Sequence, residues 1–349
     1  MTARLRYPPK PVPGDRVAVL SPSFAGPAYF PAPYTLGLRR LLEEFHLTPV
    51  EYPTTRAADA SPADRAADIE TAFQDPGIRA VIATLGGSDE LKVLRHLHPD
   101  ILAAHPKPFF GYSDNTNLLH FLWRAGVVSY HGGSIMVQWG RPGAMHPTTA
   151  ASLKSALFSS DWFLLEASDT FTDEEQCDWT RPETLMSVPS LERADPWAWY
   201  GPASRVEGPA WGGCLEIIDY QLRAGRYLTS LETYRGAVLF LETSEDMPSA
   251  AYVYEVLMGM GERGLLELFA AVLVGRPKAW SPESPNDPAR KRRYAAEQRA
   301  AILKAIAEYN PGVPIVFNLD IGHTDPQIVV PHGGTVRVDG VRRQIAVRY

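Results

Sequence analysis

Three short stretches of the sequence carry side chains that together could cleave an acyl bond. Ser113 lies in PFFGYSDNTNLL, directly after an apolar run and directly before a helical pattern. A serine at a sharp strand-to-helix turn projects its hydroxyl from the sheet, and the N–H groups after it favour developing negative charge. The spacing is not GxSxG, because Asn115 stands where the second glycine would be. The same residues leave open that Ser113 or Asp114 only caps the helix.

The second stretch, ATLGGSDE, ends an apolar run in the pair Gly86 and Gly87. Paired glycines after a buried strand let a ligand approach the backbone closely and leave N–H donors free. The turn at Gly87 can therefore supply one N–H group to an oxyanion, beside that of Asp114. The alternative for this stretch is an anion site without catalysis.

The third feature is a pair of stretches, FLETSED and NLDIGHTD, each of which follows an apolar run. Both are expected at the carboxyl edge of a sheet, where α/β proteins place ligands. His323 could take the proton of Ser113, and Glu242 could orient the imidazole and stabilise its charge. Spacing does not separate Glu242 from Glu245, but Glu242 ends the run VLFLE and is therefore preferred. Taken alone, His323 is also compatible with an ordinary loop or core histidine.

Alternating apolar runs and helical patterns predict the elements that position these residues. The predicted strands cover 16–23, 80–87, 108–113, 127–133, 236–243, 270–276 and 313–323. The predicted helices cover 36–46, 61–73, 115–125, 211–222, 250–260 and 289–309. Strands separated by helices imply right-handed crossovers, so the fold class is α/β with a mostly parallel sheet. The last residues alternate as antiparallel strands do, and the basic cluster 291–293 is expected on a solvated helix face.

The segment 161–200 differs in composition from both halves of the chain. It holds ten acidic and two basic residues, and four of the eight tryptophans, Trp162, Trp179, Trp197 and Trp199. A flexible linker would be poor in aromatic residues, whereas aromatic residues on a long polar loop suggest a lid or a ligand-stacking surface. The alternative is that the tryptophans only fix the loop to the body of the protein.

Composition excludes several classes of protein. At ~150 residues per domain, the 349 residues correspond to about two domains. A formal charge of −6 argues against nucleic-acid binding and gives no attraction to an anionic membrane. No apolar run approaches the ~18 residues of a membrane span, and the N-terminus lacks the apolar region of a signal peptide. The two cysteines, Cys177 and Cys214, match no zinc or redox spacing. These features predict a cytoplasmic protein.

In the order GYSDNTNLL, VLFLETSED and NLDIGHTDPQ, these stretches resemble the LD-carboxypeptidase family of serine peptidases. Within that family, the chain is more similar to the microcin C immunity protein (MccF-like) branch. The resemblance runs from the SPS turn at 21–23 to the terminal strands. The stretches are fairly specific together, although none of them is specific alone.

The resemblance implies a catalytic triad of Ser113, Glu242 and His323, and an oxyanion hole from the backbone N–H groups of Gly87 and Asp114. It implies a flavodoxin-like N-terminal domain at 1–160, a linker and lid at 161–205, and a C-terminal β/α domain at 206–349. It also implies a homodimer with the site between the two domains, and neither a metal nor an organic cofactor.

Two branches of the family imply two substrates. The immunity branch cuts the amide between an aminoacyl or peptidyl group and a nucleotide-like moiety, whereas LD-carboxypeptidases release D-alanine from murein tetrapeptides. The tryptophans of 161–200 favour the first branch, because an indole can stack on a purine. Trp179, Trp197 and Trp199 are the candidates for that contact. A hypothesis of another class is a protein that binds such a small molecule without cutting it.

Overall fold

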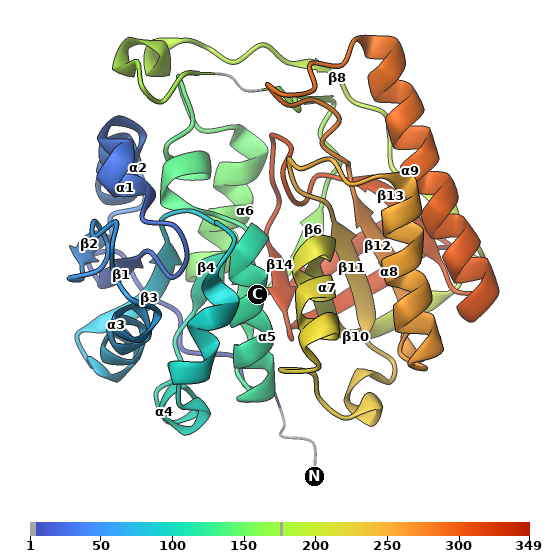
Figure 1. Ribbon diagram of the computed structural model, residues 1–349, viewed down its shortest axis with the longest axis horizontal. Helices are drawn as coiled ribbons and strands as arrows, with labels where there is room; N and C mark the ends of the chain where they lie inside the picture. Colours follow the sequence, from blue (N-terminus) through green and yellow to red (C-terminus); the bar gives the residue numbers. More distant parts are fainter. Residues whose placement is uncertain (1–4, 175–176) are drawn as a thin grey trace.

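A computed structural model describes residues 5–174 and 177–349. Fourteen strands of this part of the chain form one mixed sheet, in which the central order is β2-β1-β3-β4-β5-β14-β10-β11-β12-β13-β9 (Figure 1). The sheet confirms the predicted α/β class, because most neighbouring strands in it are parallel. No helix of the described residues is both long enough and apolar enough to cross a membrane.

The strands of the first half and of the segment after it are β1 Arg16–Leu20, β2 Thr48–Glu51, β3 Ile78–Ala83, β4 Phe109–Gly111, β5 Ser129–His131, β6 Trp162–Leu165, β7 Thr170–Phe171, β8 Glu192–Arg193 and β9 Ala198–Tyr200. The strands that follow are β10 Arg205–Cys214, β11 Val238–Glu242, β12 Ala271–Gly275, β13 Ile315–Leu319, β14 Val330–His332, β15 Thr335–Asp339 and β16 Gln344–Arg348.

Helices cover both faces of this sheet (Figure 1). They are α1 Gly26–Tyr29, α2 Pro31–Glu43, α3 Pro62–Gln74, α4 Pro99–Ala104, α5 Thr116–Arg124, α6 Pro147–Phe158, α7 Leu215–Ala224, α8 Ala250–Glu262 and α9 Pro288–Tyr309. The short helices include η3 Ser113–Asn115, η4 Ile135–Trp139 and η5 Pro182–Met186. Strands such as β11 and β12 are buried along their whole length. A strand covered on both faces must be apolar throughout, which is why these elements appear in the sequence as continuous apolar runs.

The strand β14 joins the two halves of the sheet. It pairs antiparallel with β5 through Val330 and His131, and parallel with β10 through His332 and Ala210. A segment close to the end of the chain therefore lies between the last strand of the first half and the first strand of the second. The division into domains at 160 and 206 stays a prediction.

One predicted helix is partly wrong. The pattern at 211–222 predicted a helix throughout, but Trp211 to Cys214 lie in β10 and pair with β11, and α7 begins at Leu215. Gly212 and Gly213 disfavour helix at this point, and the apolar residues around them are buried as a central strand.

Candidate active site

Ser113 lies on a strained turn between β4 and α5. Its φ of +60° is in the left-handed region, which residues other than glycine rarely adopt and which often marks a functional position. No side-chain cap hydrogen bond begins η3 or α5, so the simpler interpretation of Ser113 as a helix cap is wrong. The strained backbone therefore orients the serine without using its side chain to cap the helix.

The paired glycines after β3 lie against this turn. A Cβ added at Gly86 would be 2.9 Å from Ser113 Cβ and 3.0 Å from its Oγ, so only glycine allows the two turns to approach this closely. Gly87 is the residue after Gly86, and Asp114 is the residue after Ser113. Both residues of the predicted oxyanion hole thus adjoin the close approach of Gly86 to Ser113. The Asp114 carboxylate is buried and accepts hydrogen bonds from Ser23 Oγ at 2.5 Å and from the Glu90 N–H at 2.9 Å. Its side chain fixes the turn, which leaves its backbone N–H as the group of interest.

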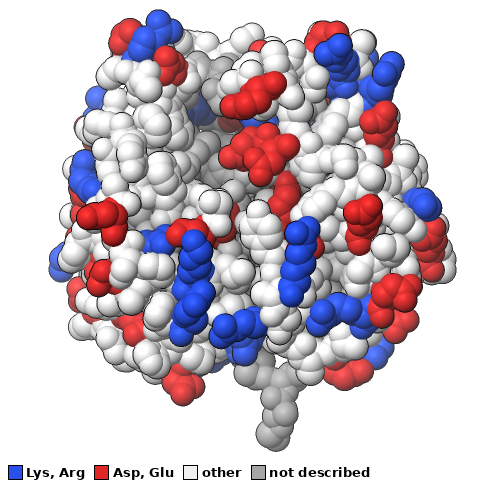
Figure 2. All heavy atoms as spheres, in the orientation of Figure 1, with Lys and Arg blue, Asp and Glu red and all other residues white. Residues whose placement is uncertain are grey.

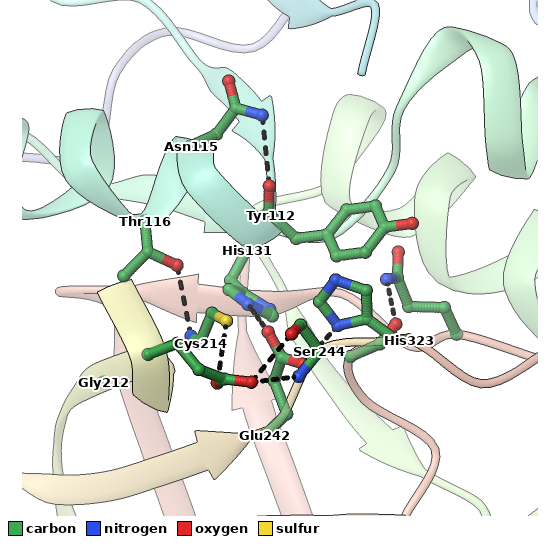
Figure 3. Close-up of polar contacts among 12 residues, drawn as sticks. Tyr112, Asn115, Thr116, His131, Gly212, Cys214, Glu242, Ser244 and His323 are labelled. Atoms are coloured by element: carbon green, nitrogen blue, oxygen red, sulfur yellow. Dashed lines mark hydrogen bonds and ion pairs between the residues drawn. The ribbon is translucent and has the colours of Figure 1, made fainter. Parts of the chain in front are cut away.

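Glu242 and His323 form a short, buried contact. Glu242 ends β11, and His323 lies in the loop after β13, where its Nδ1 is 2.6 Å from Glu242 Oε2 (Figure 3). The preceding residue, Gly322, has φ of +93°, and a Cβ there would be 2.5 Å from the same carboxylate oxygen. Glycine at this position lets the histidine loop lie directly on the carboxylate.

Electrostatics favour the charged forms of both groups. Burial raises the pKa of Glu242, but the charge of His323 and the hydrogen bonds from His131 and His323 outweigh burial and hold the pKa below its usual value. Burial lowers the pKa of His323, but the charges of Glu242 and Glu245 outweigh it and raise the pKa above the usual value. The resting pair is therefore a carboxylate and an imidazolium.

Glu245 also contacts the imidazole, so both carboxylates that the spacing could not separate lie beside His323. Its Oε2 is 3.2 Å from His323 Nε2, within ion-pair range, although this nitrogen has no partner aligned as a hydrogen bond. The Glu245 side chain is 59% exposed, whereas that of Glu242 is fully buried. The imidazole thus lies between one buried and one exposed carboxylate.

Two residues that sequence reasoning did not select complete the surroundings of this pair. His131 Nε2 is 3.4 Å from Glu242 Oε1, and Gln327 accepts the Gly133 N–H at 2.7 Å and donates to Gly322 O at 2.6 Å. Gln327 thereby connects the turn after β5 to the loop that carries His323. The glycine pair after His131 was a signal for a turn, but no spacing in the sequence connects it with Glu242.

Tyr112 packs against both histidines. Its ring centroid is 5.1 Å from that of His323 and 6.2 Å from that of His131, with edge-to-face geometry in both cases (Figure 3). Because Tyr112 directly precedes Ser113, the serine turn begins one residue from this contact, although His323 Nε2 accepts no hydrogen bond from Ser113 Oγ. The fold therefore brings Tyr112 and His323, which are more than 200 residues apart in the chain, together at one site.

A cavity of about 880 Å³ opens beside this site. It is lined by Tyr112 and His323, by the chain after β5, and by parts of the acidic segment, including Trp179. Trp179 also packs on Phe30, with ring centroids 5.5 Å apart, and Trp280, which sequence reasoning did not select, lines the same cavity. Figure 2 shows a hollow in the upper part of this face, with acidic side chains beside it.

The other two candidate tryptophans lie elsewhere. Trp199 is in β9 and pairs with Val316 of β13. Trp197 packs against the hydrophobic core that includes Val316. Neither lines the cavity. The ends of the predicted linker and lid are thus strands of the main sheet, because β6 pairs with β16 and β9 with β13.

Two carboxylates of the acidic segment are attached to the body of the protein by Lys291. Lys291 Nζ is 2.6 Å from Asp173 Oδ1 and 2.8 Å from Glu174 Oε1, and its side chain is only 12% exposed. The expectation that the cluster 291–293 is merely a solvated face is therefore wrong for Lys291, although Arg292 and Arg293 are exposed. Within the described residues, no group of three or more His, Cys, Asp or Glu side chains could hold a metal ion.

Comparison with known proteins identifies the family. Residues 17–132 match the LD-carboxypeptidase N-terminal domain, and residues 207–338 match the LD-carboxypeptidase C-terminal domain. YocD of Bacillus subtilis, named as a putative carboxypeptidase, is 27% identical over 291 residues, which cover 79% of this chain and 78% of YocD.

Two solved structures share the fold. An MccF-like protein from Streptococcus pneumoniae in complex with AMP has a TM-score of 0.83 at 23% identity, covering 96% of this chain and 99% of the other. MccF in complex with glutamyl sulfamoyl guanosine has a TM-score of 0.81 at 20% identity, covering 98% of each chain. With both domains matched in order along its length, the chain belongs to the LD-carboxypeptidase family of serine peptidases.

Proposed function

We propose that this chain hydrolyses the amide bond between an aminoacyl or peptidyl group and a nucleotide-like moiety, with a triad of Ser113, His323 and Glu242. The observation that carries the proposal is the 2.6 Å buried contact between Glu242 and His323 beside the strained turn of Ser113. A carboxylate that fixes one imidazole nitrogen leaves the other free to act as a base on a serine hydroxyl.

Each residue has one role in the proposed mechanism. Ser113 Oγ attacks the carbonyl carbon while His323 Nε2 accepts the serine proton, and Glu242 stabilises the resulting imidazolium. The N–H groups of Gly87 and Asp114 donate to the oxyanion of the tetrahedral intermediate. His323 then gives its proton to the leaving nitrogen, and a water molecule, activated in the same way, releases the acyl group from the serine.

The nucleotide-like leaving group is supported by the cavity. Its volume of about 880 Å³ suits a substrate larger than an amino acid. Trp179 and Trp280 line it, as do two basic residues, Arg141, which pairs with Asp325 at 2.8 Å, and Lys278, which donates to Asp173 O at 2.8 Å. The related structures hold AMP and an aminoacyl sulfamoyl nucleoside, respectively. The second candidate, release of D-alanine from murein tetrapeptides, is favoured by the family to which the chain belongs.

We also propose a cytoplasmic homodimer. The support for the dimer is the resemblance to the family. Sedimentation equilibrium tests the assembly directly, and a mass of one chain at micromolar concentration would contradict it.

The central test offers both substrates to one preparation. The protein is incubated with an aminoacyl sulfamoyl-adenosine and, separately, with a murein tetrapeptide, and products are followed by mass spectrometry. We expect cleavage of the first, and a loss of about 10³-fold to 10⁶-fold in kcat in Ser113→Ala. Cleavage of the tetrapeptide alone would favour the second candidate.

Labelling separates an enzyme from a binding protein. A serine-reactive phosphonate should modify wild-type protein at Ser113 and leave Ser113→Ala unmodified. A folded protein that binds the nucleotide substrate but neither cleaves it nor reacts with the phosphonate would support the non-catalytic hypothesis.

Trp179, which lines the cavity, gives a further prediction. Stacking of a base on an aromatic side chain contributes about 1–3 kcal/mol, so Trp179→Ala should raise KM for the nucleotide substrate by about tenfold to a hundredfold. Trp162→Ala is the control, because this indole lies in β6 under Arg337 and does not line the cavity. Equal kinetics in both variants would contradict the stacking role.

A further inference from the structure

We propose that His131 is a positioning residue of the active site, which holds Oε1 of Glu242 so that Oε2 faces His323. The proposal rests on the proposed function, because it assigns His131 a role through the acid of the triad. His131 is the last residue of β5 and is fully buried. Its neighbours in the sheet are Gly111 of β4 and Val330 of β14.

The imidazole of His131 faces the carboxylate oxygen that His323 does not bind. His131 Nε2 lies 3.4 Å from Glu242 Oε1, within ion-pair range but not aligned as a hydrogen bond, and both side chains are fully buried. Neither Glu242 Oε1 nor His131 Nδ1 has a closer polar partner in residues 5–174 and 177–349. Figure 3 shows the carboxylate between the two imidazoles, one on each oxygen.

This arrangement favours one tautomer of His131. Since Oε1 is an acceptor and Nδ1 has no hydrogen-bond partner among the described residues, the tautomer with its proton on Nε2 suits this contact. Leaving a buried carboxylate oxygen without a nearby donor is costly. The carboxylate is therefore stabilised in the orientation in which each oxygen faces an imidazole nitrogen.

The surrounding side chains prevent alternative positions. The His131 ring packs edge-to-face on Tyr112 at 6.2 Å and on Phe240 at 5.1 Å between centroids. Glu242 itself is enclosed by backbone, since a Cβ at Gly275 would lie 3.0 Å from Glu242 Cβ. Without His131, the carboxylate could rotate about its last torsion and weaken its contact with His323 Nδ1.

His332 provides a matched control within the same fold. It is also fully buried at a strand end, and its ring lies 5.1 Å from that of His120 and 5.7 Å from that of Trp123. Both of its nitrogens lack a hydrogen-bond partner in the part of the chain that the structure describes. Replacing His332 therefore disturbs a buried histidine without touching the acid of the triad.

The test compares four variants with wild type on the cleaved substrate. His131→Leu removes the donor, and we expect kcat to fall by about tenfold to a hundredfold, as for outer partners of metal ligands, with KM within about twofold. His131→Gln places an amide N–H near the position of Nε2 and should recover most of kcat. His131→Asn has an amide too short to reach and should stay low, and His332→Leu should retain wild-type kcat.

A spectroscopic readout separates positioning from folding. The proton between His323 Nδ1 and Glu242 gives a downfield NMR resonance, which should shift or broaden in His131→Leu and His131→Asn but not in His131→Gln or His332→Leu. The acid limb of the kcat/KM profile reports the ionisation of His323, which faces Glu242, Glu245 and Tyr112. We expect this limb to move only in His131→Leu and His131→Asn. If His131→Leu does not fold, the contrast between Asn and Gln decides the question.

Two outcomes would overturn the inference. The first is a His131→Leu variant with wild-type kcat and an unshifted resonance. The second is an equal loss in His131→Leu and His332→Leu, which would make His131 structural only. Failure of the proposed function can be distinguished from failure of this inference. In the first case wild type would cleave neither substrate, while the NMR resonance would still report whether His131 positions the carboxylate.

Discussion

At the scale of single residues, the imidazole of His323 is placed between two carboxylates of different character. Glu242 is buried and binds Nδ1, whereas Glu245 is largely exposed and lies 3.2 Å from Nε2. The proposed mechanism needs Nε2 for the serine proton, so Glu245 stabilises a resting state in which the base is already protonated. Its carboxylate has to give way when substrate and serine engage the imidazole.

This arrangement predicts the pH dependence of the reaction. Because the two carboxylates raise the pKa of His323, the neutral base forms only as pH rises above the usual value of about 6.5. The value of kcat/KM should therefore rise with pH through this raised pKa. Glu245→Gln removes one of the two charges, so the acid limb should move to lower pH.

The measurement is kcat/KM between about pH 5 and about pH 10. Glu207→Gln is the control, because Glu207 pairs with Arg337 and does not contact His323. An acid limb that stays in place, or moves to higher pH, in Glu245→Gln would show that Glu245 does not act on the imidazole.

Gly322 gives a second prediction at this scale. Alanine there would place a methyl group 2.5 Å from Glu242 Oε2, so Gly322→Ala should displace the histidine loop and lower kcat by at least about tenfold. Gly312→Ala is a matched control, because its φ of +95° resembles the +93° of Gly322 but nothing lies within 4 Å of the added Cβ. Both variants should lose about 1 kcal/mol or more of stability from backbone strain, measured by urea unfolding. Equal activities in the two variants would contradict the steric argument.

At the scale of elements, the sequence predicted the parallel strands well. The predicted runs at 16–23, 80–87 and 236–243 contain most or all of β1, β3 and β11, because a buried parallel strand must be apolar along its length. The pattern at 211–222 predicted the wrong element at its start, because the end of a buried strand and the start of a buried helix can share one apolar run. Only pairing with β11, which the local sequence does not encode, decides between them.

The acidic segment shows a different limit of sequence reasoning. Its charge and its tryptophans indicated an unusual element, but not which side chains attach it and which face the cavity. Trp199 is fixed by pairing with β13, more than 100 residues later in the chain, and Lys291 on α9 holds Asp173 and Glu174. Contacts at such separations leave no local pattern from which to predict them.

The attachment by Lys291 can be tested by removing its charge. Lys291→Met keeps the aliphatic length but leaves Asp173 and Glu174 without this cation, so the segment should be cleaved faster in limited proteolysis. Glu174 lines the cavity; a loss of about 1 kcal/mol in the segment's attachment should therefore raise KM for the nucleotide substrate by about fivefold. Arg292→Met, exposed on the same helix, is the control. Identical proteolysis of the two variants would contradict the attachment.

At the scale of the whole molecule, the candidate site depends on segments from both halves. Ser113 and His131 come from the first half of the sheet, and Glu242 and His323 from the second. The sequence indicated Ser113, Glu242 and His323, but not His131, through the strand ends on which these residues lie and through the resemblance to a family. It could not indicate the contact between His131 and Glu242, because that contact depends on how β5, β14 and β10 are ordered in the sheet.

The same order of strands predicts how the protein unfolds. The strand β14 pairs with β5 on one side and β10 on the other, and one hydrophobic core extends from Val17 to Tyr349. Loss of either half would expose the core and the strand edge of the other, so we expect a single transition. Chains of this length often unfold in several steps, which makes the expectation specific.

Differential scanning calorimetry measures this directly, with a ratio of calorimetric to van't Hoff enthalpy near one as the expected result for a single cooperative unit. Phe110→Ala in β4 and Phe240→Ala in β11 remove buried rings from the two halves. Each should cost about 3–5 kcal/mol and should lower the midpoint of the one transition without splitting it. A scan that resolves two transitions, with each variant lowering a different one, would mean that the halves are independent domains. In that case β14 would only dock between the two halves, and the site would be assembled at an interface that can open before either half unfolds.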